Sequence, residues 1–222
     1  MRFVKHLGSV TLAVAATMML GSLSACSDPV APPTATAREI ATVDAAPSLL
    51  LTSPTTLHFR RGAPPLEQTR ISFYAKKGQA KSVSLYYRTP SGGRGDEYAR
   101  FVLPADGLLQ RPDGRLIARG DSVLITISAP DPSLLLLRME PHGLRFEPRS
   151  PARLTMHYDQ ADRDLNGDGY VNLIDAVLEL RLAIWRQPTL LDLFTRLTSL
   201  LDRSNASVAA DLPGFSQYII AY

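Results

Sequence analysis

One stretch of the chain decides how its C-terminal part is interpreted: Asp164-Leu165-Asn166-Gly167-Asp168-Gly169-Tyr170-Val171-Asn172-Leu173-Ile174-Asp175. Oxygen-bearing side chains stand at the first, third, fifth, ninth and twelfth positions of this twelve-residue run. Gly169 stands sixth, where a chain that wraps an ion must turn sharply, and the seventh residue offers its backbone carbonyl. The spacing predicts a calcium site with the ligands Asp164, Asn166, Asp168, the carbonyl of Tyr170, Asn172 (directly or through water) and Asp175.

The chemistry of calcium explains this spacing. Ca2+ prefers about six to eight hard oxygen ligands in a flexible shell. Without an ion, the carboxylates of Asp164, Asp168 and Asp175 would repel one another across the turn. A register that starts at Asp162 fails, because it places a glycine eighth and a leucine twelfth. The alternative without metal is an ordinary turn of Asn, Asp and Gly residues before a helix.

The residues around the loop distinguish it from an ordinary EF-hand. Residues 152–158 alternate apolar and polar like a strand, so no entering helix is expected, and Asp175 takes the place of the usual closing Glu. The run Asp-x-Asn-x-Asp-Gly-x-Val-Asn-x-x-Asp, with the helix expected after it, resembles a single repeat of a type I dockerin over about Asp164–Trp185. That resemblance implies a small calcium-folded module that docks into a cohesin-like protein on a bacterial surface.

Helical spacing is the pattern expected after the loop. Leu173–Arg186 carries apolar residues at three-four spacing, a second helix is predicted from Thr189, and a short last helix is predicted within residues 215–222. A complete dockerin has two calcium repeats. The segment Asp202–Asp211 is two residues too short for one and lacks the glycine and the middle acid, so at most a degenerate repeat without metal is expected there. Residues 159–222 are therefore predicted to form an all-α, dockerin-like module.

Residues 51–158 alternate with a period of two. Apolar residues recur at every second position of several runs, among them Ile71–Ala75, Val83–Tyr87 and Val123–Ile127, and Gly- and Pro-containing turns separate these runs. About seven or eight short strands in a segment of this length predict an antiparallel β-sandwich. The predicted fold class is thus mainly β plus α, an antiparallel sandwich followed by the small all-α module.

Parts of the sandwich segment resemble a second family. Phe101–Leu108 and Asp121–Ile127, with His142–Phe146 and Pro151–Tyr158, are similar to segments of the ZU domain, a β-sandwich found in ankyrins, netrin receptors and bacterial surface lipoproteins. Pro104-Ala105-Asp106-Gly107 departs from the Pro-Pro-Gly turn that is usual there. The resemblance implies interaction with a partner rather than catalysis.

The chain opens with the features of an export signal. A basic start precedes the apolar run Leu7–Leu20, and Leu23-Ser24-Ala25-Cys26 resembles a bacterial lipobox. The resemblance implies removal of residues 1–25, a lipid on Cys26 and a place in the cell envelope, in the outer membrane because Ser27 and not Asp follows. The alternative is a cleaved secretory signal with a chance cysteine. No internal disulfide can form, because the chain has a single cysteine.

Residues 26–50 follow the predicted lipid site with a different composition. They contain four prolines and few large aliphatic residues. Such a segment buries too little apolar area to order itself. We therefore expect it to act as a tether between the membrane and the folded part of the chain.

The charge of the chain is mildly positive, with 24 Lys and Arg against 21 Asp and Glu and a formal net charge of +3. The basic residues are spread along the predicted strands, without the clustered helix or the interleaved aromatics of a nucleic-acid site. The pattern argues against nucleic acid as a partner. Anionic lipid headgroups or a surface glycan remain alternatives.

The sequence contains no catalytic constellation. It has no Gly-x-Ser-x-Gly elbow, no His-Glu-x-x-His pair and no phosphate loop, and His58, His142 and His157 stand singly. We predict a non-enzymatic, lipid-anchored surface protein with a scaffold, adhesion or docking role. The alternative is a carbohydrate-binding module or polysaccharide-active enzyme in which calcium is structural. A third hypothesis is that the predicted helices pack on the chain's own sandwich and have no external partner.

Overall fold

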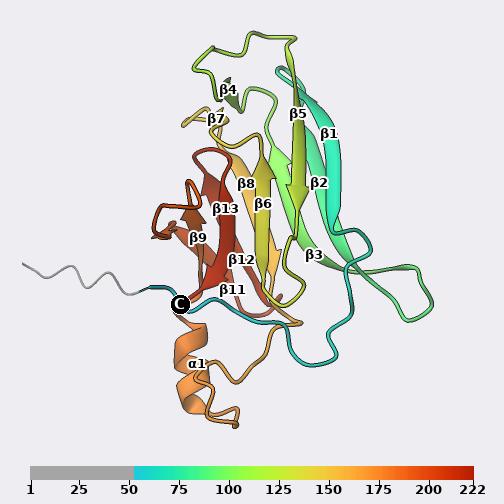
Figure 1. The fold of residues 1–222 in the computed structure, drawn as a ribbon, viewed down its shortest axis with the longest axis vertical. Helices are drawn as coiled ribbons and strands as arrows, with labels where there is room; N and C mark the ends of the chain where they lie inside the picture. Colours follow the sequence, from blue (N-terminus) through green and yellow to red (C-terminus); the bar gives the residue numbers. More distant parts are fainter. Residues whose placement is uncertain (1–52) are drawn as a thin grey trace, which may run out of the picture. The chain divides into compact units, whose positions relative to one another are not determined.

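The computed structural model describes residues 53–222 (Figure 1). The predicted signal peptide of residues 1–25, the lipid site Cys26 and the tether of residues 26–50 lie outside the described residues and stay predictions. No helix within residues 53–222 has both the length and the apolar character needed to cross a bilayer.

Eight strands precede residue 158, in agreement with the predicted seven or eight, and β5 shows the period-two alternation clearly. In β5, Val123, Ile125 and Ile127 are buried while Ser122 and Leu124 face outward, so one face of the strand lies against the core. The strands are β1 Arg70–Lys76, β2 Lys81–Arg88, β3 Arg94–Leu103, β4 Leu108–Gln110, β5 Ser122–Ser128, β6 Leu136–Glu140, β7 Arg145–Phe146 and β8 Ala152–His157.

The C-terminal residues form one short helix and five further strands. These elements are α1 Leu173–Glu179, β9 Ala183–Gln187, β10 Thr195–Arg196, β11 Ser199–Asp202, β12 Ser207–Leu212 and β13 Gln217–Ala221. The predicted all-α module of residues 159–222 is therefore wrong. The protein is mostly β, and α1 is the one helix among residues 53–222.

The strands form two main antiparallel sheets. The six-stranded sheet has the order β1-β5-β6-β13-β9-β10, and the five-stranded sheet has the order β11-β12-β8-β3-β2. A small third sheet pairs β4 with β7. Both main sheets contain strands from before and after residue 158, which are joined where β13 pairs with β6 and where β12 pairs with β8. The C-terminal segment thus completes the sandwich.

The short last helix predicted within residues 215–222 is wrong, because Gln217–Ala221 form the strand β13. All five residues of this strand are buried. Tyr218 and Ile220 face the main core, while Ile219 and Ala221 pack into a second cluster with Leu136. A short apolar run that is covered on both faces has no period-two signal, so periodicity alone cannot separate it from a buried helix.

The helix predicted over Leu173–Arg186 is only half correct. It ends at Glu179, and Ala183–Gln187 becomes β9 because all five of its residues pair with β13. The helix predicted from Thr189 is a turn followed by two short strands, and Leu191 there is 97% exposed. Strand pairing has overridden the helical three-four spacing of the leucines that follow Thr189.

The main core lies between the two sheets. Phe215 is fully buried, and its ring lies 5.6 Å from that of Phe101 and 5.1 Å from that of Phe146, measured between centroids. These rings come from three separate parts of the sequence, so the C-terminal segment contributes to the same core as the strands before residue 158.

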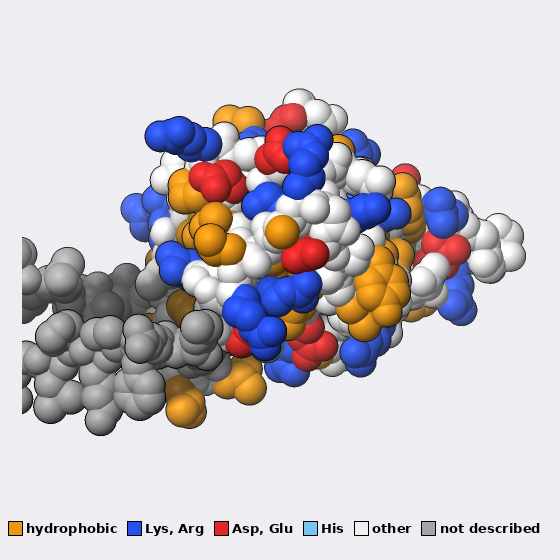
Figure 2. Space-filling view, turned by 90° about the horizontal axis from the view of Figure 1, so that it is seen from above, with side chains coloured by type: hydrophobic (Ala, Val, Ile, Leu, Met, Phe, Trp, Pro, Cys, Tyr) orange, Lys and Arg blue, Asp and Glu red, His pale blue; other side chains and the backbone are white. Residues whose placement is uncertain are grey.

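Charged side chains are mixed on the surface. Figure 2 shows Lys and Arg side chains interspersed with Asp and Glu on the face seen from above. Charged side chains of the described residues also form pairs, for example Arg153 with Asp211 at 3.0 Å and Arg94 with Glu67 at 3.2 Å. Mixed and paired charges of this kind do not build a strong field of one sign.

Candidate metal centre

The candidate calcium loop connects β8 to α1 at the end of the sandwich where the described chain begins and ends (Figure 1). Asp162 donates its N–H to the carbonyl of His58 at 2.9 Å, and Tyr222 donates its hydroxyl to the carbonyl of Leu165. Both contacts come from segments distant in sequence. The loop is therefore fixed to the sandwich before it turns.

Asp164, the first predicted ligand, closes the turn. Its carboxylate accepts the N–H groups of Asp168 at 3.1 Å and Gly169 at 2.7 Å. Gly169 has a φ of +86°, in the left-handed region that a residue without Cβ adopts readily. The glycine at the sixth position thus has the sharp backbone turn that the spacing predicted.

Asp168 lies at the centre of the loop. Its carboxylate accepts hydrogen bonds from the side-chain amides of Asn166 at 2.8 Å and Asn172 at 3.0 Å, and from the N–H of Tyr170 at 2.9 Å. The amide of Asn166, with help from these other donors, holds the pKa of Asp168 below its ordinary value. Asp168 therefore stays a carboxylate at neutral pH.

Asp175, the last predicted ligand, is buried, with 3% of the residue exposed. It accepts the backbone N–H groups of Asn172 and Leu165, both at 2.7 Å, and of Asn166 at 3.1 Å. The hydrogen bond from the N–H of Asn172 is the main reason why its pKa lies below the ordinary value. Asn172 in turn caps α1, and the two residues form a capping box.

The six predicted ligand residues come together in one hydrogen-bonded turn. Besides the contacts above, the side-chain amide of Asn172 lies 3.4 Å from the carbonyl of Tyr170. Within residues 53–222, however, no three His, Cys, Asp or Glu side chains converge as a metal-binding group. The carboxylates face backbone N–H groups, and the nitrogens of Asn166 and Asn172 face Asp168.

The donor set fits calcium in its chemistry, because every predicted ligand supplies an oxygen. Ca2+ would require the amides of Asn166 and Asn172 to present oxygen instead of nitrogen, a half-turn about one side-chain bond. The same half-turn would remove their hydrogen bonds to one oxygen of Asp168 and free that oxygen for the ion, and it would also remove the hydrogen bond from the N–H of Ile174 to the side-chain oxygen of Asn172. Calcium binding at this loop stays a prediction.

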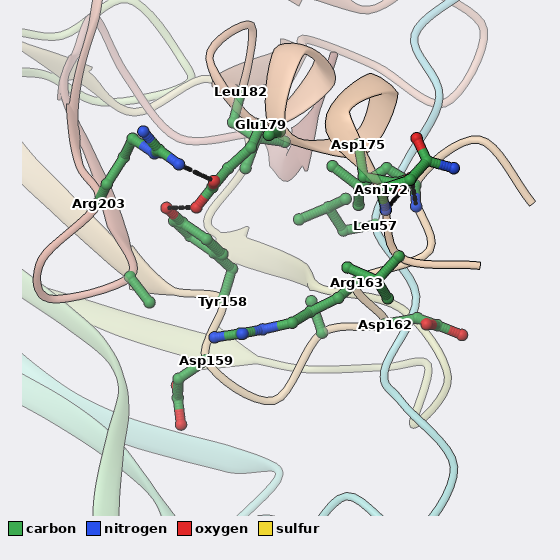
Figure 3. Close-up of a pocket in the computed structure, with 15 residues that line it drawn as sticks. Leu57, Tyr158, Asp159, Asp162, Arg163, Asn172, Asp175, Glu179, Leu182 and Arg203 are labelled. Carbon is green, nitrogen blue, oxygen red and sulfur yellow. Dashed lines mark hydrogen bonds and ion pairs between the residues drawn. The ribbon is translucent and has the colours of Figure 1, made fainter.

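A pocket of about 300 Å3 lies beside the loop, between α1 and the sandwich (Figure 3). Glu179 of α1 accepts a hydrogen bond from the hydroxyl of Tyr158 at 2.9 Å and two from Arg203, at 2.8 and 3.0 Å. Burial, more than the contact with Glu179, raises the pKa of Tyr158, which therefore stays protonated. These contacts attach the C-terminal end of α1 to the sheet.

Tyr158, Glu179 and Arg203 were not among the residues that sequence reasoning selected. They belong to three separate segments, after β8, within α1 and between β11 and β12. No spacing rule connects such positions, since only the folded chain brings them together. Asn172 and Asp175 of the loop also line this pocket, so it adjoins the candidate metal centre.

The degenerate repeat at Asp202–Asp211 is part of a β-hairpin. Asp202 ends β11 and accepts the N–H groups of Ser204 at 3.1 Å and Asn205 at 3.2 Å. Residues 207–212 then form β12, which returns antiparallel to β11. Asp202 thus stabilises a tight turn between two strands, which is a common structural role of Asp.

Comparison with protein-family models, characterised proteins and solved structures finds no match to this chain. The dockerin-like and ZU-like resemblances therefore rest on the quoted residues alone. The antiparallel sandwich is observed, whereas the two family assignments remain proposals.

Proposed function

We propose that this protein is a non-enzymatic, lipid-anchored protein of the bacterial cell surface whose loop Asp164–Asp175 binds Ca2+. The observation that carries the calcium proposal is the presence of the six predicted ligand residues in one hydrogen-bonded turn, with Gly169 in the left-handed region and Asn172 and Asp175 starting a helix. Each of these features has the place that the spacing requires.

The proposed role of the ion is to order the loop and α1. Three carboxylates, Asp164, Asp168 and Asp175, lie within one turn of backbone, and a divalent cation offsets their mutual repulsion. Binding to the folded state adds stability as RT ln(1 + [Ca]/Kd), or about 1.4 kcal/mol at tenfold excess over Kd. Extracellular calcium modules work at about 0.1–1 mM, so the site is filled outside the cell.

The proposed setting is the outer membrane, through a lipid on Cys26 and the tether of residues 26–50. The lipobox-like Leu23-Ser24-Ala25-Cys26 supports it. The dockerin-like loop supports a docking role towards a cohesin-like protein, and the sandwich is proposed to carry that loop. The proposal does not include the all-α module predicted from the sequence, because the strands β9 to β13 lie within residues 183–221.

One observation favours a second candidate function, the binding of a surface glycan. A shallow groove of about 500 Å3 runs between β1 and β2, the edge strands of the two main sheets. Lys81, Arg94 and Arg100 line it together with Ser72 and Tyr86. Hydroxyl, aromatic and cationic groups in one groove suit an acidic saccharide, and a glycan array tests this directly.

Calorimetric titration with calcium tests the leading proposal. The wild type is expected to bind one Ca2+ and to melt at a higher temperature in calcium than in chelator. Asp168→Ala removes the central carboxylate and is expected to abolish both effects. Asp202→Ala is the matched control, because it removes an Asp from a hydrogen-bonded turn outside the loop, and it should keep calcium binding. A wild-type melting curve that calcium leaves unmoved would contradict the proposal.

A further inference from the structure

Six large apolar side chains are exposed on the candidate calcium loop, on α1 and at the residue that caps its C-terminal end. We call them the loop–helix apolar face, which consists of Tyr170, Val171, Leu173, Ile174, Val177 and Leu180. Their exposed fractions run from 46% at Val177 to 79% at Leu173. A soluble protein rarely leaves so many neighbouring apolar residues in water unless the surface binds something.

The helix is oriented with its apolar side outward. Asp175 of α1 is buried, and Glu179 is turned towards Tyr158 and Arg203. Surface helices normally do the opposite, with apolar residues against the core and charged residues in water. The polar contacts of α1 with the sandwich therefore hold Leu173, Ile174 and Val177 in the exposed position.

The shape and position of this face fit a bilayer surface. Figure 1 shows α1 projecting from the end of the sandwich. The described chain enters at the same end, where Thr55 donates its N–H to the carbonyl of Tyr222 at 3.2 Å. A projecting apolar segment with a tyrosine beside it matches the way in which protein segments enter the headgroup region of a membrane.

The segment between Cys26 and the described part of the chain is long enough for the loop–helix apolar face to contact the membrane. Twenty-six residues separate Cys26 from Ser53. A flexible segment of that length spans about 30 Å on average and no more than about 90 Å when extended. A lipid on Cys26 would therefore hold the loop–helix apolar face close to the bilayer surface. Close tethering raises the effective concentration of the face at the membrane.

We propose that the loop–helix apolar face inserts into the headgroup region of the membrane that carries the predicted Cys26 lipid, and that calcium permits this insertion. The calcium step rests on the proposed function, because Ca2+ would neutralise the carboxylates that otherwise lie beside the bilayer. Arg163 before the loop and Arg181 after α1 are exposed and can contact anionic headgroups. The occupant of the face is thus a lipid surface.

Vesicle sedimentation tests this proposal. Residues 49–222 contain both sheets and the whole described core, so a fragment of these residues keeps the fold without the lipid. The probe is a vesicle of phosphatidylethanolamine and phosphatidylglycerol in equal parts. The fragment is expected to sediment with vesicles in millimolar calcium, to stay in solution in chelator, and to remain bound when salt is raised, because apolar insertion is not screened.

Two matched variants locate the contact. Leu173→Asp with Ile174→Asp places two charges on the face, and vesicle affinity is expected to fall at least about tenfold. Leu190→Asp with Leu191→Asp changes the same residue types on the exposed turn after β9, where the leucines are 64% and 97% exposed, and affinity should not change. Both variants should keep calcium binding by calorimetry.

Three results would overturn the membrane proposal. If the fragment binds calcium but not vesicles, the membrane proposal is wrong and the proposed calcium site stands. If the fragment does not bind calcium, the result counts against the proposed function instead. A calcium-dependent dimer that Leu173→Asp with Ile174→Asp disperses would assign the face to a second copy of the chain. Calcium-dependent capture of a purified cohesin domain, lost in the same variant, would assign it to a protein partner.

Discussion

Asp175 and Asn172 hold each other in place at the start of α1. The carboxylate of Asp175 accepts the N–H of Asn172 at 2.7 Å, while the side-chain oxygen of Asn172 accepts the N–H of Ile174 at 2.7 Å. Because the other oxygen of Asp175 accepts the N–H groups of Leu165 and Asn166, the pair also joins the two ends of the loop. One buried carboxylate therefore fixes both the loop and the first turn of the helix.

The first prediction concerns Asp175→Ala in the absence of calcium. The substitution leaves the N–H groups of Leu165, Asn166 and Asn172 without their acceptor, so their amide hydrogen exchange should become markedly faster. Asp168→Ala is the control, because Asp168 accepts none of these three N–H groups. NMR exchange rates check the result. Equal protection of all three amides in wild type and Asp175→Ala would contradict the structural role given to this carboxylate.

The second prediction compares two glycines. Gly169 has a φ of +86°, but a Cβ there would meet nothing within 4 Å, so Gly169→Ala should cost only about 1–2 kcal/mol from backbone strain. A Cβ on Gly214 would collide with the carbonyl oxygen of Leu144, where a backbone hydrogen bond from Phe215 also lies. Gly214→Ala should therefore destabilise the protein more than Gly169→Ala. Urea unfolding of both variants measures the difference, and a reversed order would contradict it.

The third prediction tests whether the C-terminal segment belongs to the sandwich. Phe215 is fully buried between Phe101 and Phe146, so Phe215→Ala should lower the free energy of unfolding by about 3–5 kcal/mol. Leu200→Ala, at a site that is 64% exposed, should change it by no more than about 0.5 kcal/mol.

Urea unfolding of Phe215→Ala, followed by two spectroscopic signals, tests most directly whether the C-terminal strands unfold with the sandwich. Trp185 lies in β9 and reports on the C-terminal strands, while circular dichroism reports on all strands. Because the sheets are shared, both signals should change together in urea. Separate transitions would mean that the strands after residue 182 unfold as an independent unit.

The sandwich could be predicted from the sequence where one face of a strand meets water. Ile125 and its period-two neighbours in β5 show this, since the buried and exposed faces have different residues. The strands after residue 182 could not be predicted in the same way. In β13 both faces are covered, and in β9 the residues Ala183–Gln187 continue the three-four spacing of α1 until pairing with β13 makes them a strand. Long-range pairing of this kind leaves no local signal.

The candidate site was easier to predict than the fold around it. The spacing from Asp164 to Asp175 is local, so it identified the turn, the place of Gly169 and the start of α1. Glu179 and its two partners could not be found, because they meet only after β8, α1 and the hairpin of β11 and β12 have assembled. The exposure of Leu173 could not be predicted either, because it depends on the contacts of Glu179, which place the polar side of α1 against the sandwich.

The last prediction concerns acid stability and a cluster at the junction of β2, β3 and β8. Glu97 is bound by Arg100 through two contacts of 3.0 and 2.9 Å, and Nε2 of His157 lies 3.5 Å away. Burial opposes ionisation of Glu97, but hydrogen bonds from Arg100 and Ser84 outweigh it and lower its pKa. An unfolded Glu has a pKa of about 4.3, so the folded state binds the proton more weakly than the unfolded state. The resulting stability is fully present above about pH 4.3 and is lost as the pH falls through the lower pKa of folded Glu97.

Glu97→Gln cannot ionise, so its free energy of unfolding at pH 7 should be lower than that of the wild type, and the difference should shrink on acidification below about pH 4. Urea unfolding at pH 3 and pH 7 measures both quantities. A difference between the two proteins that stays constant over this range would show that Glu97 acts through packing and not through its charge.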